Sequence, residues 1–162
     1  MNITDAAHTV NVSLIDFNNS NFTMNRYGDL FYYLWNTSLN SDGIYNIKIF
    51  FNDSLGFSNT DALLGITADN TNPKIYNPLT SANSRNFVSP GFAFNASVNA
   101  TDANLLNMTC ALSGTTIANF SNDGNAYYCN LTAPSTENDY TITFTAKDKA
   151  GNANSTTAGF TT

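Results

Sequence analysis

Residues 138–152 read NDYTITFTAKDKAGN, and this stretch decides the fold class of the chain. Between Tyr140 and Ala146, apolar side chains occupy every second position and threonines occupy the positions between them. A period of two predicts a half-buried antiparallel strand. The turn that follows is built from Asp148, which can accept hydrogen bonds from nearby backbone, and Gly151, which tolerates a positive φ.

The same arrangement occurs earlier, at residues 41–59, which read SDGIYNIKIFFNDSLGFSN. At a fixed offset of 95 positions, Tyr45 aligns with Tyr140 and Asp53 with Asp148. The same ungapped register pairs Tyr32 with Tyr127, Tyr33 with Tyr128, Thr37 with Thr132, Ile47 with Ile142 and Gly56 with Gly151. The chain is therefore predicted to contain two copies of one unit, residues 1–70 and 71–162.

Short strands at regular spacing predict an all-β chain with two tandem β-sandwiches, each of two packed sheets. In the first copy we expect strands at 8–17, 22–27, 30–35, 44–52 and 61–68. In the second copy we expect strands at 74–79, 92–100, 105–112, 116–120, 126–131, 140–146 and 156–161. Before the aromatic strand the offset is interpreted as shrinking to about 84, with an inserted edge strand between Gly114 and Asn122 of the second copy.

The first copy has few residues ahead of its first expected strand. The second copy opens with a strand at Lys74–Leu79, whereas only seven residues precede His8 in the first. The first copy is therefore expected to lack most of its first strand. Either it is an excised fragment, or a neighbouring subunit donates a strand, because exposed strand edges invite pairing.

Three stretches carry a family resemblance: the strand and turn at 140–152, the run DLFYYLWNTSLNSDGIYNIKIFFND at 29–53, and the joint DNTNPKI at 69–75. Together they resemble the immunoglobulin-like repeats of bacterial and archaeal surface proteins, including cadherin-like domains. The resemblance implies β-sandwiches in tandem on secreted or cell-wall proteins, and therefore an extracellular location. Members of such families differ widely in ligand, so the resemblance implies no particular one.

Composition and charge exclude several function classes. Aromatic residues make up 13% of the chain, which is enough to fill a core, and charged residues only 11%. A net charge of −6 argues against nucleic-acid binding, which needs clustered Lys and Arg. No apolar run is long enough to span a membrane, and no leader peptide is recognised. Because Met1 is followed by repeat-like sequence, we interpret it as an artificial start or as the start of a mature segment.

Cys110 and Cys129 each occupy the apolar parity of a predicted strand. A disulfide between them would close a loop of about 20 residues and contribute roughly 3 kcal/mol. It would also indicate an oxidising compartment. Two buried free thiols are the alternative. A zinc site is not expected, because the spacing is not that of a zinc motif and further Cys ligands are absent.

The chain is dense in N-x-[ST] sequons. They occur at Asn2, Asn11, Asn18, Asn21, Asn36, Asn52, Asn95, Asn99, Asn107, Asn119, Asn130 and Asn154. Several fall on the outward parity of a predicted strand, where a glycan would leave the core undisturbed. The alternative is that these sequons only reflect the polar alternation of a solvent-facing strand.

No catalytic arrangement is recognised. His8 is the only histidine, and Glu137 and Asp139 flank a turn residue as solvated acids. Structural calcium at the joint is an open possibility, because residues 69–72, Asp53 and Asp148 offer oxygen ligands. No cofactor is otherwise expected.

Two function classes remain open. The first is a structural module of a cell-surface or filament-forming protein, in contact with neighbouring repeats or identical subunits. The second is an adhesin or carbohydrate-binding module. An exposed platform of Trp35, Tyr32 and Tyr127 would favour glycan binding, whereas inward packing of these rings would favour the structural class.

Overall fold

The computed structural model describes residues 10–17, 20–81, 86–117 and 120–162 of the chain. They belong to two compact units, Met1–Asn70 and Thr71–Thr162. In the described residues the regular structure is β-strand, apart from one turn of 3-10 helix, η1, at Thr37–Leu39. The predicted all-β fold class is therefore confirmed.

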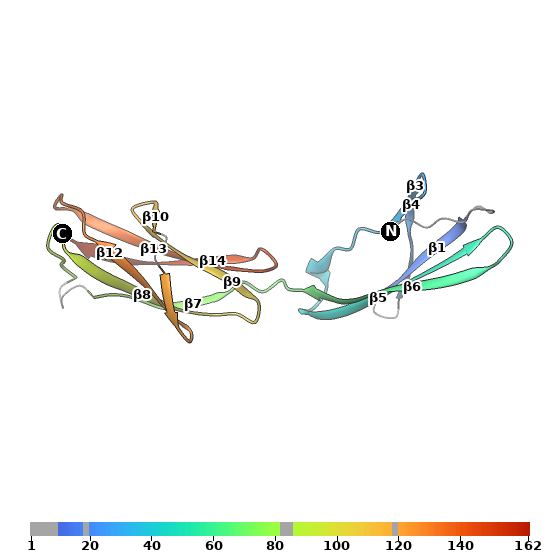
Figure 1. Cartoon of the computed structure of the whole chain (residues 1–162), viewed down its shortest axis with the longest axis horizontal. Helices are drawn as coiled ribbons and strands as arrows, with labels where there is room; N and C mark the ends of the chain where they lie inside the picture. Colours follow the sequence, from blue (N-terminus) through green and yellow to red (C-terminus); the bar gives the residue numbers. More distant parts are fainter. Residues whose placement is uncertain (1–9, 18–19, 82–85, 118–119) are drawn as a thin grey trace. The chain divides into compact units, whose positions relative to one another are not determined.

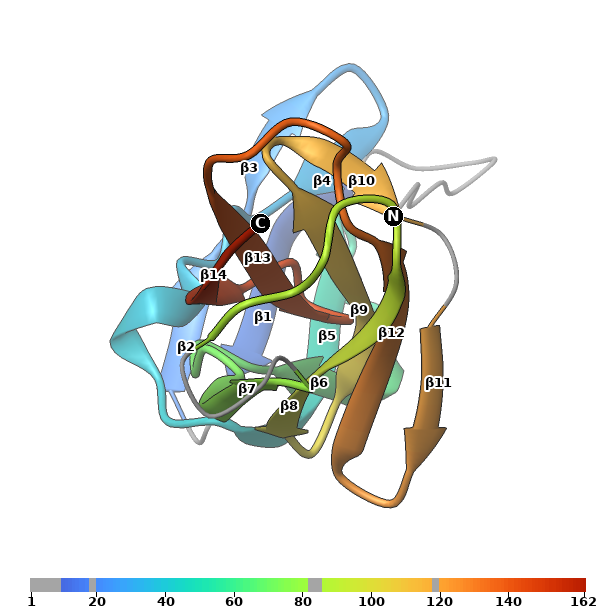
Figure 2. The same ribbon diagram turned by 90° about the vertical axis from the view of Figure 1, so that its left-hand side faces the viewer.

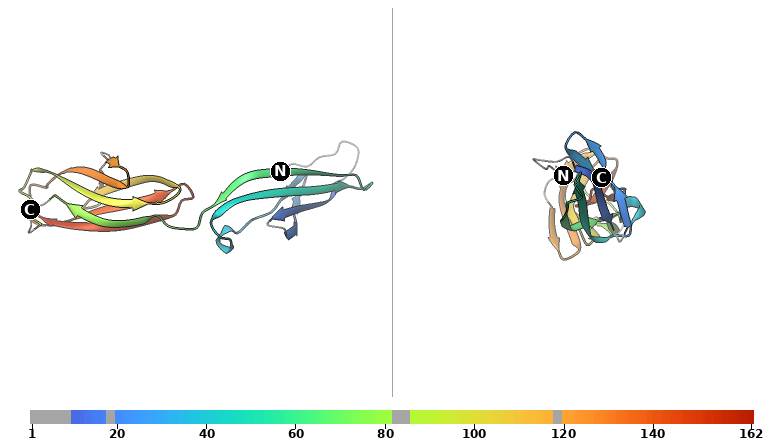
Figure 3. Two further views of the ribbon diagram at one scale, coloured as in Figure 1. Left: turned by 90° about the horizontal axis from the view of Figure 1, so that it is seen from below. Right: turned by 90° about the vertical axis from the view of Figure 1, so that its right-hand side faces the viewer.

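The second unit is a complete two-layer sandwich (Figures 1 and 3). Its strands are β7 (Lys74–Thr80), β8 (Ala93–Thr101), β9 (Leu105–Leu112), β10 (Thr115–Ile117), β11 (Phe120–Asp123), β12 (Ala126–Thr132), β13 (Asp139–Asp148) and β14 (Ala153–Thr161). One antiparallel sheet has the order β10-β9-β13-β14, and the other has the order β11-β12-β8-β7. Figure 2 shows β11 beside β12 at one edge of the second sheet.

The core of the second unit lies between these sheets. Along β13 the side chains of Ile142, Phe144 and Ala146 are fully buried, and the intervening threonines are more exposed. They face β8, in which every second side chain is likewise buried, including Phe94 and Val98. The period-two pattern of both strands thus places one apolar row from each sheet in the shared interior.

The first unit has one complete sheet and a short hairpin. The sheet has the order β2-β1-β5-β6. Its strands are β1 (Val10–Phe17), β2 (Ser20–Thr23), β5 (Gly43–Asp53) and β6 (Ser58–Ala68), and the hairpin is formed by β3 (Asn25–Tyr27) and β4 (Leu30–Tyr32). The buried core residues of this unit are Ile15, Met24, Phe31, Ile47 and Ile49.

The sheet of the first unit repeats the strand pairing of the second at an offset of 95. Ile15 pairs with Ile49 in β1 and β5, and the residues 95 positions later, Cys110 and Phe144, pair in β9 and β13. The expected shortening of the offset to about 84 is therefore wrong, because β1 corresponds to β9 and not to β8. A polar–apolar alternation fits any strand of the right parity, and only the pairing with β5 distinguishes them.

The edge strand expected as an insertion between Gly114 and Asn122 is also a shared element. Ser20 of β2 pairs with Phe17, and Thr115 of β10 pairs with Leu112, which is the same pairing shifted by 95 positions. The expected strand at 22–27 divides, because β2 belongs to the sheet and β3 to the hairpin.

The hairpins of the two units align with an offset of 96 instead. Their two-residue turns contain Gly28 and Gly124, whose φ values are 60° and 56°. The turn in the first unit joins Tyr27 to its partner Leu30, as the turn in the second joins Asp123 to Ala126. The sequence alignments of Tyr32 with Tyr127 and Tyr33 with Tyr128 are therefore wrong by one position, and the alignment of Thr37 with Thr132 sets a residue of η1 against one of β12. In the structure, Phe31, Tyr33 and Trp35 correspond to Tyr127, Cys129 and Leu131.

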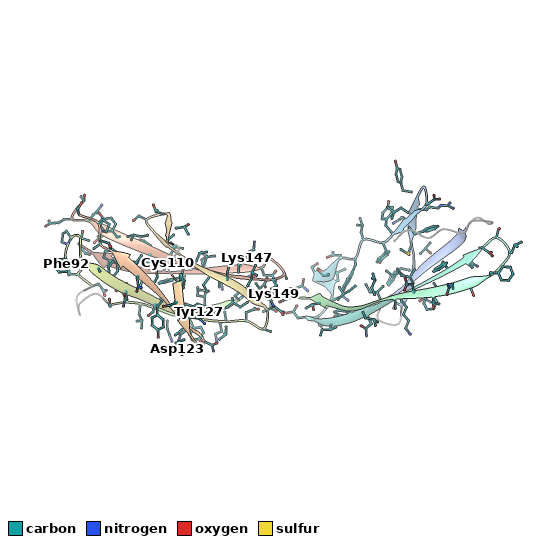
Figure 4. All side chains as sticks on the ribbon, viewed as in Figure 1. Phe92, Cys110, Asp123, Tyr127, Lys147 and Lys149 are labelled. Carbon is teal, nitrogen blue, oxygen red and sulfur yellow. A yellow bond between two sulfur atoms is a disulfide. The ribbon has the colours of Figure 1, made fainter. Side chains whose placement is uncertain are left out.

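Cys110 and Cys129 are joined by a disulfide that links β9 of one sheet to β12 of the other (Cys110 is labelled in Figure 4). Both residues are fully buried. The bond therefore connects the two layers of the second unit, and the first unit has Ile15 and Tyr33 at the corresponding positions.

We predict that reduction of this disulfide lowers the free energy of unfolding of the second unit by about 3 kcal/mol, because the opened loop gains entropy in the unfolded state. The chain has one tryptophan, Trp35, in the first unit. In urea titrations with and without reductant, circular dichroism should show a shifted transition, while Trp35 fluorescence should not shift. The double variant Cys110→Ala/Cys129→Ala is the control, and its unfolding transition should be the same with and without reductant. An unchanged wild-type transition would contradict the prediction.

Candidate functional site

The second layer of the first unit is incomplete in the described part of the chain. In the second unit, β12 has β11 on one side and β8 on the other, and β7 lies beyond β8. In the first unit the described residues form only the β3–β4 hairpin in this layer. The first unit thus lacks described counterparts of both β7 and β8, which is more than the single first strand expected from the sequence.

The incomplete layer leaves apolar side chains on the first sheet accessible to solvent. Leu63 of β6 pairs with Ile47, as Ala158 of β14 pairs with Ile142 in the second unit. Ala158 is half-buried against the core, whereas 53% of the Leu63 surface is exposed. In the second unit β7 lies against β14, and the described residues of the first unit include no counterpart of β7 beside β6.

The aromatic segment that follows β4 packs into the first unit. Strand structure ends at Tyr32 and not at the expected Trp35. The Trp35 indole packs edge-on against Tyr45 at a centroid distance of 5.2 Å, and its Nε1 donates a hydrogen bond of 2.7 Å to Oδ1 of Asn40. Tyr33 stacks on Phe22, also at 5.2 Å.

Two of the three rings whose exposure would favour glycan binding pack inward. Trp35 is half-buried against the core of the first unit, and Tyr127 (labelled in Figure 4) is half-buried against that of the second. Tyr32 is exposed, but it lies on the opposite face of β4 from the buried Phe31. By the criterion set from the sequence, this inward packing favours a structural module.

A pocket of about 350 Å³ remains beside the packed aromatic segment. Phe22, Tyr33 and Trp35 contribute rings to its wall, and Asn36 and Asn40 contribute amides. Both amide oxygens already accept hydrogen bonds, from Ser38 in the first case and from the Trp35 indole in the second. Sequence reasoning missed this pocket, because it depends on the approach of β2 to a segment that is not a strand.

Asp53 and Asp148 shape equivalent turns in the two units. Oδ1 of Asp53 accepts hydrogen bonds from the backbone of Leu55 and Phe57, and Oδ1 of Asp148 accepts them from Gly151 and Asn152. In each unit the aspartate therefore organises the turn after the central strand, in agreement with the turn chemistry expected for Asp148.

The environment of Asp148 favours its charged form. Burial would raise the pKa of this carboxyl group, but the Asn152 side chain and the backbone N–H groups of Asn152, Gly151 and Ala150 outweigh burial and lower the pKa below 3.8. The Asn152 side chain donates to the second carboxylate oxygen, Oδ2, at 2.8 Å. Asp148 is thus a satisfied buried anion.

Of the joint residues proposed as calcium ligands, Asn70 is hydrogen-bonded within the first unit. The backbone N–H of Asn70 donates to Oδ1 of Asp42 at 2.6 Å, and its side chain donates to the carbonyls of Thr37 and Asn40. In the second unit the carboxylates of Asp148 and Asp102 come within 4.8 Å of each other. Asp102, which the sequence did not indicate, also accepts a hydrogen bond from the backbone of Asn104.

Most of the sequons with a described side chain are exposed. The exposed ones are Asn21, Asn36, Asn95, Asn107, Asn130 and Asn154, and the half-buried ones are Asn52 and Asn99. Oδ1 of Asn52 is buried without a hydrogen-bond partner. Asn2, Asn18, Asn119 and His8 lie outside the described residues, and so does the side chain of Asn11.

The two acidic residues that flank Asn138 form no further site. Glu137 and Asp139 are exposed, and Oδ1 of Asp139 accepts a hydrogen bond from the Thr161 hydroxyl. Among the described residues, no helix has the length and apolar character needed to cross a membrane.

Comparison with known proteins supports the fold. No family profile and no curated protein matches the chain. Among solved structures, the fibronectin(III)-like modules of Clostridium thermocellum CbhA align over 97% of this chain and 80% of their own, with a TM-score of 0.59 and 12% identity. A Bacteroides ovatus surface glycan-binding protein, SGBP-B, solved with a mixed-linkage heptasaccharide, aligns at a TM-score of 0.28 and 20% identity, over 93% of this chain and 38% of its own. The first likeness identifies the fold as an immunoglobulin/fibronectin-type β-sandwich.

We predict that acid destabilises the second unit through Asp148. Its folded-state pKa lies below the unfolded-state value, so the stabilisation by the carboxylate is present above pH 3.8 and is lost as the pH falls through the folded-state pKa. Asp148→Asn should lower the melting temperature at pH 7, because the new amide would set a donor against the Asn152 amide. The difference in melting temperature between the variant and the wild type should become smaller towards pH 2.

The matched control for this prediction is Asp123→Asn, which changes an exposed acid in the same unit (Figure 4). Melting curves from pH 7 to about pH 2 should leave this control parallel to the wild type. A constant deficit for Asp148→Asn across the whole range would contradict the role of the ionised carboxylate.

We predict that glycosylation, in a host with the pathway, selects the outward strand positions Asn95, Asn107 and Asn130 over the half-buried Asn52 and Asn99. Asn95 and Asn130 are direct cross-strand partners, so two glycans there would compete for the same space. Intact-glycopeptide mass spectrometry should find few molecules that carry both. Unmodified protein, or preferential occupancy of Asn52, would refute this prediction.

Proposed function

We propose that the chain is a non-enzymatic extracellular structural module of a cell-surface or filament-forming protein. In this proposal it serves as a spacer, stalk or fibre subunit in contact with neighbouring repeats or identical subunits, and donated strands join the units. The observation that carries the proposal is the first unit, which keeps the strand register of the second but whose described residues form only a hairpin in the second layer. A unit of this kind gains a full core by assembling with a neighbour.

The location outside the cell is supported by the Cys110–Cys129 disulfide, because such bonds persist in oxidising compartments. The exposed sequons and the low content of charged residues are compatible with a glycosylated surface. The resemblance to tandem surface repeats agrees with this location, although it names no ligand.

The two ends of the joint support a load-bearing role. Asn70 is anchored in the first unit by three hydrogen bonds. At the start of the second unit, the Asn154 side chain donates to the Pro73 carbonyl at 3.1 Å and Asn152 donates to the Thr71 carbonyl at 3.4 Å. Tension along the chain would therefore meet hydrogen bonds at both ends of a short connection. A calcium ion at Asp102 and Asp148 would be an added brace and belongs to this proposal.

The alternative is an adhesin or carbohydrate-binding module. The specific observation in its favour is the pocket beside Phe22, Tyr33 and Trp35, because aromatic walls with amide groups are common in sugar sites. All three rings make packing contacts within the unit, Phe22 with Tyr33 and Trp35 with Tyr45, which weakens the alternative.

A glycan array with the intact chain tests the choice between the two functions. We expect no glycan to bind above background, because the pocket amides are already hydrogen-bonded. Specific binding that Phe22→Ala abolishes, and that the matched exposed aromatic variant Phe92→Ala in the second unit retains, would overturn the structural proposal. Circular dichroism should show that both variants fold.

A further inference from the structure

We propose that Tyr128, on the outer face of the second unit, is the platform on which the first sugar of an N-glycan at Asn130 packs. The inference rests on the extracellular location in the proposed function, because N-glycosylation is a modification of secreted proteins. It gives the glycan a partner of defined chemistry within the chain. The face of an aromatic ring carries partial negative charge and attracts the C–H groups of an N-acetylhexosamine ring.

Asn130 and Tyr128 lie on the same face of β12. Cys129 and Leu131 alternate with them and are buried in the core, so Tyr128 and Asn130 both point away from it. Asn130 is exposed, and 38% of the Tyr128 surface is exposed. Residues two apart along a strand are separated by roughly 6.5–7 Å, which is within reach of a sugar ring attached to the asparagine side-chain nitrogen.

Tyr128 has small polar neighbours on both sides. Its cross-strand partners are Ser97 on β8 and Ser121 on β11. The cross-strand partner of Asn130 is Asn95, another amide. The ring is therefore surrounded by uncharged groups that can hydrogen-bond to the hydroxyl and N-acetyl groups of a sugar. Asn95 is itself a sequon, but it lies diagonal to Tyr128 at about 7–8 Å, farther away than Asn130.

Asn99 also lies beside an aromatic residue on this face, but it is less suited to a packed glycan. Its cross-strand partner is Tyr76 on β7. The ammonium group of Lys74 already lies over that ring, 5.3 Å from its centroid. Asn99 is also half-buried, whereas Asn130 is exposed. The geometry therefore favours Asn130 as the site whose glycan packs on the protein.

Asn107 provides a matched sequon with a different surrounding. It is exposed on β9, in the other sheet of the same unit. Thr109 follows it on the same face, and Lys147 is its cross-strand partner. Neither neighbour carries a ring. The second unit thus offers one outward sequon with an adjacent aromatic side chain and one whose strand neighbours are not aromatic.

Covalent attachment makes a weak contact of this kind effective. A single aromatic ring holds a free sugar too weakly to count as a binding site, which agrees with the blank glycan array expected above. An attached sugar stays near the ring, because a short linker holds it at a high effective concentration. The contact exists only in the folded unit, where the strand holds positions 128 and 130 on one face. The glycan therefore stabilises the folded state.

Chemical glycosylation of the intact chain tests the inference without a glycosylating host. Both natural cysteines are in the disulfide, so Asn130→Cys introduces a unique free thiol. Its thiolate displaces bromide from the N-bromoacetyl derivative of N-acetylglucosaminylamine, which forms a thioether and releases the bromide ion. Bromoacetamide attaches the same linker without the sugar and is the mock treatment. The matched site is Asn107→Cys, and Tyr128→Thr removes the ring.

We expect the sugar at position 130 to raise the folded-to-unfolded ratio of the second unit about threefold over mock treatment, the effect of an ordinary side-chain pair on a sheet surface. With Tyr128→Thr, and at position 107, sugar and mock treatment should give the same ratio. Tyr128→Phe keeps the ring and should keep the gain. Urea titrations followed by circular dichroism measure the ratio. Nuclear magnetic resonance spectra of the folded chain should show the sugar C–H protons shifted upfield by the ring of Tyr128.

A gain that persists with Tyr128→Thr, an equal gain at position 107, or no gain at position 130 would overturn the inference. Sugar proton shifts that do not depend on Tyr128 would also overturn it. These failures differ from failure of the proposed function, because they leave the structural role in place. Specific binding on the glycan array that Phe22→Ala abolishes removes the structural role and does not change the result at Tyr128.

Discussion

A β-sheet with one apolar face is stable only when a second layer covers that face, and this constraint governs both units. In the second unit β13 contributes Ile142, Phe144 and Ala146, and the facing sheet covers all three. Burial of apolar surface contributes roughly 25 cal/mol per Å², so the facing layer supplies much of the stability of the unit. The corresponding strand β5 buries Ile47 and Ile49, but its neighbour β6 leaves Leu63 half-exposed. The two units thus share the same sheet arrangement and differ in how much of its apolar face is buried.

The two units also differ in how their layers are held together. In the second unit the Cys110–Cys129 bond ties β9 to β12. The first unit has Ile15 and Tyr33 at these positions, and Tyr33 stacks on Phe22. A covalent tie limits the separation of the layers in any state, whereas an aromatic contact yields when the layers part. The second unit therefore has a covalent link between its layers at a position where the first unit has an aromatic contact.

The alternation of polar and apolar residues was enough to predict the all-β class and most strand positions. Residues 105–112 were predicted as a strand with the bounds that the structure has, because both ends are marked by a change in pattern. The alignment of the units was less predictable. In β1 the apolar residues Val10, Val12 and Leu14 fit the alternation of β8, but the buried residue is Ile15, so the sequence could not show that β1 corresponds to β9. The one-residue shift at the hairpin depends on turn geometry at Gly28 and Gly124, and it was invisible in an ungapped alignment. The pocket and the nearness of Asp102 to Asp148 depend on loops whose course no periodicity describes.

The proposed assembly would also contribute to the stability of the first unit. Full burial of a leucine side chain contributes about 1.5–3 kcal/mol relative to an exposed one, and Leu63 has made only part of that gain. A partner that binds the folded unit and not the unfolded chain stabilises it by mass action, in proportion to the logarithm of its concentration. The second unit has little left to gain, since its central strand is already covered and its layers are tied by a disulfide. Under the proposed function, contact with a neighbour would therefore stabilise the first unit more than the second.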